Sequence, residues 1–156
     1  MRLCEILTVD RILVDGDGGH VRNKADALRV LADMLARALH VDRARLEEHL
    51  IERERLQSTG IGDGVAIPHT ALEEAESQAA ALLVCPQGID FDAIDGGRVS
   101  IVFGVVGPKR ATGEHLRTLA RISRLLRDDS TRAQLASASS PAAAYSLIQA
   151  HDVQAR

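Results

Sequence analysis

Residues 58 to 69 read Ser-Thr-Gly-Ile-Gly-Asp-Gly-Val-Ala-Ile-Pro-His, the most informative pattern in the chain. Glycines at positions 60, 62 and 64 allow backbone conformations that other residues rarely adopt, so the chain can turn tightly and pass close to a ligand or partner. Pro68 lacks an amide proton and fixes its own φ angle, which stiffens the backbone directly before His69. The pattern predicts a rigidly presented histidine after a short apolar run. The competing interpretation is a structural turn followed by a histidine whose hydrogen bonds are satisfied.

The glycine spacing differs from the two common nucleotide-binding motifs. A dinucleotide-binding loop reads GxGxxG and a P-loop reads GxxxxGK[ST]. The chain instead has GxGxG with no lysine after it. Nucleotide binding is therefore not predicted.

The overall composition is that of an ordinary globular protein. The 156 residues are 46% hydrophobic and 26% charged, with 19 Lys and Arg against 22 Asp and Glu, which excludes intrinsic disorder as the general state. This length suits one hydrophobic core, so we expect residues 1–156 to form a single domain. The low aromatic content of 2% and the formal net charge of −3 argue against nucleic-acid binding.

No segment predicts membrane insertion or secretion. The longest apolar stretches, Ala79 to Cys85 and Ile101 to Val106, fall far short of the roughly 20 residues that a transmembrane helix needs. The N-terminus meets the acidic Glu5 at once and has no apolar h-region. Cys4 and Cys85 lie far apart and outside any CxxC motif, which indicates unpaired thiols in a reducing compartment. We therefore expect a cytoplasmic protein without an integral membrane segment.

Helix-like and strand-like patterns alternate outward from residues 58–69. Buried strands are expected at 65–67, 80–85 and 99–106, which are short, apolar and rich in β-branched residues. Apolar stripes predict helices over 25–39, from the N-cap Asp42 to near Ser58, over about 114–127, and around 131–136 and 141–150. The stripe of the third helix consists of Leu116, Leu119, Ile122, Leu125 and Leu126. Turns are expected at 15–19, at Gly88 and at 95–97. This alternation, without an internal repeat or a long linker, predicts one α/β unit.

Several segments, in order along nearly the whole chain, resemble the signature of the fructose/mannitol-type (type 2) enzyme IIA domains of the bacterial phosphoenolpyruvate:sugar phosphotransferase system. They are Arg53-Glu54, residues 58–69, Gly88 to Asp92, Asp95-Gly96 and Glu114-His115-Leu116. The resemblance implies an α/β sandwich with a central mixed β-sheet flanked by helices. It also implies that His69 receives a phosphoryl group on Nε2 from the phosphohistidine of the carrier protein HPr, with His115 and Arg53 beside it.

These residue types suit such a transfer on physical grounds. A neutral imidazole is available near pH 7 because the pKa of histidine is about 6.5, and its free ring nitrogen can attack phosphorus. Cationic and N–H donors stabilise the charge that spreads over the phosphoryl oxygens. Arg53 offers a permanently charged fork of donors, the competing interpretation being a solvated helix residue paired with Glu52 or Glu54. His115 could donate a hydrogen bond to the phosphoryl group. Without the resemblance it would be interpreted as a cap or a surface residue.

Candidates for binding phosphate or shaping the loop are Ser58, Thr59, Gly60, Gly62 and Gly64. The two hydroxyls can bond either the loop backbone or phosphate oxygens, and we favour the structural role. Arg117, Arg121 and Arg124 follow His115 at helical spacing; they are better explained as the wet face of a helix than as a docking stripe for an acidic partner. The histidines at 20, 40, 49 and 151 stand in no comparable context.

No cofactor is predicted, and no set of His, Cys, Asp and Glu has the spacing of a metal motif. The chain carries no permease or second carrier domain and reads Gly-Val-Ala-Ile-Pro-His at the motif, which favours the nitrogen-regulatory branch. Members of that branch act as regulators that bind target proteins according to their phosphorylation state. The alternatives are a sugar-specific enzyme IIA that passes phosphate to a separate IIB/IIC permease, and a binding module that accepts no phosphate. The expected partners are an HPr-type carrier and either a regulated target protein or a IIB domain.

Overall fold

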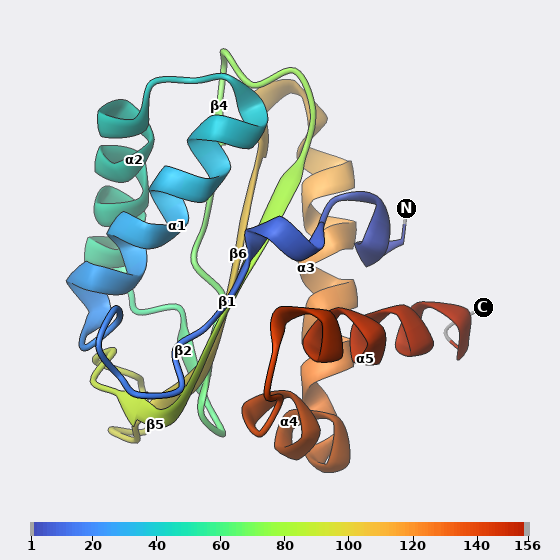
Figure 1. Ribbon diagram of the computed structural model, residues 1–156. Coiled ribbons are helices and arrows are strands. Elements are labelled where there is room, and N and C mark those ends of the chain that lie inside the picture. Colours follow the sequence, from blue (N-terminus) through green and yellow to red (C-terminus); the bar gives the residue numbers. More distant parts are fainter. Residues whose placement is uncertain (1, 155–156) are drawn as a thin grey trace.

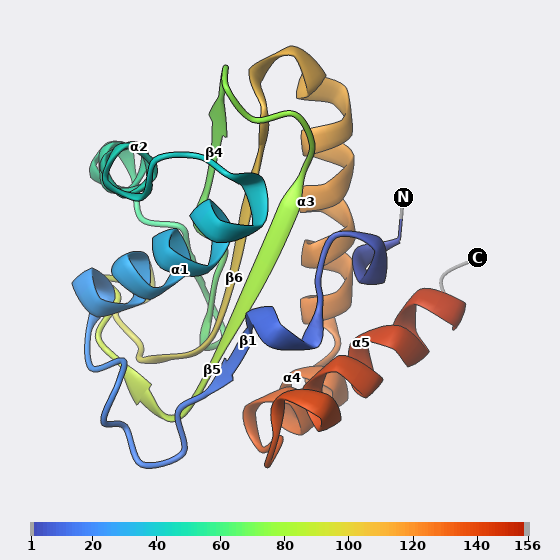
Figure 2. The ribbon, with the colours of Figure 1, turned by 45° about the horizontal axis from the view of Figure 1, so that its top comes forward.

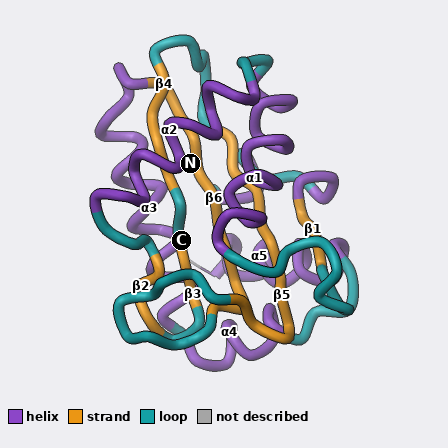
Figure 3. Tube along the Cα trace, turned by 90° about the vertical axis from the view of Figure 1, so that its left-hand side faces the viewer, coloured by secondary structure: helices purple, strands orange, loops and turns teal. Residues whose placement is uncertain are grey.

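A computed structural model describes residues 2–154. Within these residues, six strands form one mixed sheet in the order β1-β5-β6-β3-β2, with β4 also paired to β6. The strands are β1 (Ile12–Val14), β2 (Gly60–Gly62), β3 (Val65–Ala66), β4 (His69–Leu72), β5 (Ala79–Ile89) and β6 (Val99–Pro108). The two long central strands, β5 and β6, are antiparallel, whereas β1 runs parallel to β5, and β3 and β4 run parallel to β6. Figure 3 shows β3 and β4 lying along one side of β6, with β5 on its other side.

Helices cover both faces of the sheet (Figures 1 and 2). One face carries α1 (Lys24–Leu39) and α2 (Arg43–Leu56), and the other carries α3 (Thr112–Arg127), α4 (Asp129–Ala136) and α5 (Pro141–Gln154). Short 3-10 turns lie at Leu3–Glu5, Val9–Arg11 and Lys109–Ala111. The structure is thus the α/β sandwich with a central mixed sheet that the resemblance implied.

The core consists of two apolar layers, one on each side of the sheet. Along β5, Ala81 and Leu83 pack toward α1 and α2, whereas Leu82 and Val84 pack toward α3 and α4. Because both faces of the central strands are covered, their sequences read as continuous apolar runs rather than as an alternation. Gly104 in β6 allows a close helix approach, since a Cβ there would lie 2.9 Å from a methyl carbon of Leu31 in α1.

Most of the predicted elements are confirmed, and the helix N-cap at Asp42 accepts a hydrogen bond from the amide of Arg45. Three short strands, β1, β2 and β4, were missed. The turn expected at Gly88 is wrong: Gly88 lies inside β5 with a φ of 75°, where the register against β6 shifts. Leu116 was assigned to the buried stripe of the third helix, but it is 60% exposed.

No helix within residues 2–154 combines the length and the apolar character needed to cross a membrane. Cys4 and Cys85, both in the described part of the chain, carry free thiols as predicted.

Candidate functional site

His69 is the first residue of β4, and its position is set by the short interruption that Pro68 makes in the sheet. Before Pro68, β3 pairs with β6 at Ile101 and Val102, and after it β4 pairs with β6 from Val105 onward. Pro68 has no amide to donate, but its carbonyl accepts from the amide of Val105 at 3.0 Å. The backbone on both sides of the break is therefore fixed, and the histidine ring emerges from a rigid strand.

The hydrogen bond of His69 defines the tautomer of its ring. Nδ1 lies 2.7 Å from the carbonyl oxygen of Ile67. A carbonyl oxygen can only accept, so Nδ1 carries the proton. Nε2 of the neutral ring then keeps a free lone pair. This is the ring nitrogen that the resemblance implied as the phosphoryl acceptor.

His115 lies beside His69, although the two are 46 positions apart in the sequence. The ring centroids are 5.8 Å apart and the ring planes are tilted by 51°. His115 belongs to the first turn of α3, which follows β6 after a single 3-10 turn, and β6 pairs directly with β4. Gly107 at the end of β6 leaves room for the ring, since a Cβ there would lie 3.7 Å from Nδ1 of His115. That Nδ1 is buried and has no hydrogen-bond partner within the described residues.

Both histidines are half-buried, and their protonation reflects this. Burial lowers the pKa of His69 from 6.5, and the charge of Arg53 lowers it further, whereas the Ile67 hydrogen bond and the charge of Glu54 act in the opposite direction. Burial also lowers the pKa of His115, with a further contribution from His69. Both rings are consequently neutral near pH 7, the form in which a ring nitrogen is nucleophilic.

A cavity of about 270 Å³ opens at His69. It is lined by Arg53, Gln57, Ser58, Thr59, Ile61, Ile67, His69, Ile94, Leu119 and Ser123. Arg53 donates from Nη1 to the carbonyl oxygen of Gln57 at 3.0 Å, which holds its side chain along the end of α2. The structure therefore brings Arg53 and His69 to one cavity, with His115 against the His69 ring.

The hydroxyl groups of the loop already have partners in the protein. Ser58 Oγ donates to the carbonyl of Phe91 at 3.3 Å and accepts from the amide of Gly60 at 3.0 Å. Thr59 is buried and its hydroxyl donates to the carboxylate of Glu54. Both residues line the cavity, yet these bonds shape the loop.

The three glycines serve the loop in two ways. Gly60 packs against the segment around Ala93, where a Cβ would lie 2.9 Å from both Cα and Cβ of that residue. Gly62, the last residue of β2, and Gly64, in the turn before β3, have φ angles of 100° and 77°, with Asp63 between them at 57°. Neither Gly62 nor Gly64 lines the cavity.

The arginines of α3 lie apart from this cavity. Arg117, Arg121 and Arg124 line a separate hollow of about 300 Å³, together with Glu114, Thr118 and Ala120. The two hollows share no lining residue. The helix face that reaches His69 instead carries Leu119 and Ser123.

The sequence reasoning missed the apolar part of the site. Ile61 and Ile94 line the cavity and are nevertheless 56% and 65% exposed. Exposed isoleucines in a glycine-rich loop and in the segment after Asp92 were a signal for a contact surface, since nothing in the fold buries them. Two large apolar side chains thus flank the opening at His69.

Comparison with known proteins gives the same family as the motif. Residues 5–151 match the family model described as "Phosphoenolpyruvate-dependent sugar phosphotransferase system, EIIA 2". The chain is 39% identical over 149 residues to a nitrogen regulatory protein of Pseudomonas aeruginosa, covering 95% of both. It is 32% identical to the fructose-specific EIIABC component of Bacillus subtilis, covering 97% of this chain and 24% of that protein.

Solved structures share the fold. The nitrogen regulatory protein IIA-Ntr of Neisseria meningitidis superposes with a TM-score of 0.84 at 32% identity, over 92% of this chain and 97% of that one. The mannitol IIA of Escherichia coli gives 0.75 at 21% identity, over 90% and 97% respectively. At that identity the second likeness shows the fold alone.

Proposed function

Because the chain belongs to the EIIA 2 family of the phosphoenolpyruvate-dependent sugar phosphotransferase system, we propose that it is a phosphocarrier in which His69 accepts a phosphoryl group from an HPr-type protein. The observation that carries the proposal is the bond from His69 Nδ1 to the Ile67 carbonyl, because it leaves Nε2 with a free lone pair at the cavity. Burial strengthens the case, since it keeps the ring neutral near pH 7.

The transfer exchanges one N–P bond for another. The lone pair of His69 Nε2 forms the new bond to phosphorus, and the old bond breaks with its electron pair returning to the donor's ring nitrogen. Nδ1 keeps its proton throughout, so the acceptor ring gains positive character as the bond forms. The carbonyl of Ile67, 2.7 Å from Nδ1, lies where it stabilises that charge.

Arg53 and His115 act on the phosphoryl oxygens in this proposal. Arg53 lines the cavity with His69 and can give two parallel N–H donors to a phosphoryl group. The ring of His115 lies beside that of His69, with the ring centroids 5.8 Å apart, and a ring N–H at this position can donate to a phosphoryl group on its neighbour. Ser58, Thr59 and Gly60 stabilise the conformation of the glycine-rich loop that lies next to the cavity.

We propose a regulatory role for the phosphorylated protein. Two relatives at 39% and 37% identity, matched over 95% and 82% of this chain, are nitrogen regulatory proteins. A phosphoryl group adds close to two negative charges beside the exposed Ile61 and Ile94. An apolar partner surface that docks there would strip water from that charge, which costs free energy, so phosphorylation acts as a switch for target binding.

A sugar-specific enzyme IIA is the second candidate. Its support is the 32% identity to the fructose-specific component of Bacillus subtilis. Transfer of the phosphoryl group to the cysteine of a cognate IIB domain would identify this function. A binding module that accepts no phosphate is disfavoured, because a cavity that holds His69 and Arg53 beside His115 has no evident use in such a protein.

The proposal is tested by intact-mass measurement after incubation with phosphoenolpyruvate, Enzyme I and HPr. We expect one acid-labile phosphoryl group on the wild type and none on His69→Ala. An unmodified wild type in the presence of charged HPr would refute the carrier function.

A further inference from the structure

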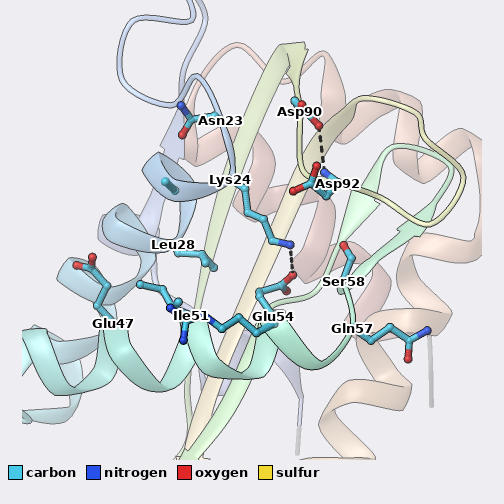
Figure 4. Close-up of a pocket in the computed structure, with 12 residues that line it drawn as sticks. Asn23, Lys24, Leu28, Glu47, Ile51, Glu54, Gln57, Ser58, Asp90 and Asp92 are labelled. Atoms are coloured by element: carbon cyan, nitrogen blue, oxygen red, sulfur yellow. Dashed lines mark hydrogen bonds and ion pairs between the residues drawn. The ribbon is translucent and has the colours of Figure 1, made fainter.

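A buried ion pair lies in a second hollow, which shares Gln57 and Ser58 with the cavity at His69. Glu54 is 6% exposed, and its Oε2 lies 2.7 Å from Nζ of Lys24 in the first turn of α1. Lys24 also lies over the ring of Phe91, 5.1 Å from the centroid. Figure 4 shows the lysine reaching across a hollow of about 740 Å³ to the carboxylate. A carboxylate this deeply buried is costly unless it is paired and hydrogen-bonded, so its position needs a reason.

The other partners of Glu54 connect it to the site. The amide of Thr59 lies 3.3 Å from both carboxylate oxygens, and the Thr59 hydroxyl donates to Oε1. The carbonyl of Thr59 in turn accepts from the amide of Ile67 at 3.0 Å. The carbonyl of Ile67 then accepts from Nδ1 of His69 at 2.7 Å. An unbroken series of contacts thus runs from Lys24 to the ring of His69.

We propose that Glu54 is a positioning residue for His69, acting through Thr59 and Ile67, and that Lys24 is the counter-ion that offsets the burial of the Glu54 carboxylate. This inference rests on the proposed function, since it assigns the carboxylate a part in phosphoryl acceptance. By fixing Thr59, the carboxylate fixes the segment that orients the Ile67 peptide. The Ile67 carbonyl sets both the tautomer and the direction of the histidine ring.

The helix geometry supports the assignment. Arg53 and Glu54 are consecutive in the last turns of α2 and point to different hollows, Arg53 to the His69 cavity and Glu54 to the Lys24 side. One helical turn therefore places the phosphoryl-binding cation and anchors the loop that holds the nucleophile. A small displacement of either group lowers the rate of a transfer that depends on the alignment of the reacting atoms.

The test compares Glu54→Gln with Glu52→Gln. The first keeps the size of the side chain but removes the charge, and its NH₂ group, a donor only, must then face either Lys24 or the donors of Thr59. The second changes an exposed carboxylate on the same helix, whose ion pair within residues 2–154 is a 3.9 Å contact with Arg55. Two quantities are measured: the tautomer of His69, from long-range ¹H–¹⁵N spectra of the unphosphorylated protein, and the initial rate of phosphoryl transfer from phosphorylated HPr.

We expect Glu54→Gln to lose the pure Nδ1–H tautomer and to accept phosphate about tenfold more slowly, whereas Glu52→Gln matches the wild type in both. The double variant Lys24→Met with Glu54→Gln removes the conflict between two donors, so it should recover part of the rate. A double variant no faster than Glu54→Gln would overturn the counter-ion role of Lys24.

A folded Glu54→Gln protein that keeps the wild-type tautomer overturns the positioning role, whatever its rate. If Glu54→Gln does not fold, Thr59→Val removes only the hydroxyl donor to Glu54 and is judged by the same two measurements. The tautomer spectra need no phosphoryl donor. A wild type that accepts no phosphate would therefore refute the proposed function while the spectra still decide the positioning role.

Discussion

Nδ1 of His69 lies 2.7 Å from the carbonyl oxygen of Ile67, two residues earlier in the chain. The residue between the two partners is Pro68, whose carbonyl oxygen accepts a hydrogen bond from the amide of Val105. The donor nitrogen is thereby fixed, and the other ring nitrogen is left for chemistry. The reactivity proposed for this protein follows from that contact, and the predictions below test its surroundings.

The rate of phosphoryl acceptance should decline at a lower pH than it would if the acceptor histidine had an ordinary pKa. The pKa of His69 is lowered from 6.5, chiefly by burial, and only the neutral ring is nucleophilic. We expect the decline in rate to be centred below pH 6.5, measured with phosphorylated HPr in excess. A decline centred at or above 6.5 would contradict the burial argument.

Folding stability should also fall in acid because of the two site histidines. The unfolded chain takes up protons at a pKa of about 6.5, whereas the folded-state pKa values of His69 and His115 are lower. Their contribution is therefore complete above pH 6.5 and is lost as the pH falls through the folded-state pKa values. Denaturant titrations between pH 7.5 and 5 should show a shallower loss in His115→Gln than in the wild type. Equal slopes would refute this.

Arg53 should matter through its fork of donors and not only through its charge. We expect Arg53→Ala to slow phosphoryl acceptance roughly 100-fold and Arg53→Lys to recover only part of that loss, because an ammonium cannot bind two oxygens in parallel. Arg55→Ala, an exposed neighbour on the same helix, is the matched control and should retain the wild-type rate. Full activity in Arg53→Ala would remove Arg53 from the site.

The stability of the protein should require glycine at position 60, because the backbone packs closely there. A Cβ at this position would lie 2.9 Å from Cα and Cβ of Ala93, so Gly60→Ala must push two backbone segments apart. We expect a loss of about 1–3 kcal/mol in the free energy of unfolding. Gly16→Ala, where a Cβ meets nothing within 4 Å, should be neutral or stabilising by up to about 1 kcal/mol. Chemical denaturation of the two variants checks the contrast, and equal stabilities would show that the close approach is unimportant.

The sequence predicted the helices well because their stability rests on local, periodic patterns. The stripe Leu28, Leu31 and Leu35 is buried as expected. The strand β4 was missed because its four residues, His69–Leu72, show no apolar alternation and are strand only through pairing with β6. Leu116 was misplaced because helical spacing does not show how wide a face the neighbouring elements cover.

In the candidate site too, the features that depend on local backbone requirements could be predicted, whereas those that depend on contacts between distant segments could not. The glycines and Pro-His carry local backbone requirements, so their part in a rigid loop could be predicted from spacing. The nearness of His115 depends on β4 and β6 being neighbours, and it came from the family resemblance. The partnership of Lys24 with Glu54 joins residues 30 positions apart on two helices and left no sequence signal.

The most direct test of the account is to locate the phosphoryl group on the ring. Protein labelled with ¹⁵N-histidine is recorded in long-range ¹H–¹⁵N spectra before and after phosphorylation by HPr. We predict the Nδ1–H tautomer of His69 in the free protein and an N–P bond at Nε2 of the same residue afterwards. Phosphorylation at Nδ1 of His69, or on any other histidine, would contradict it.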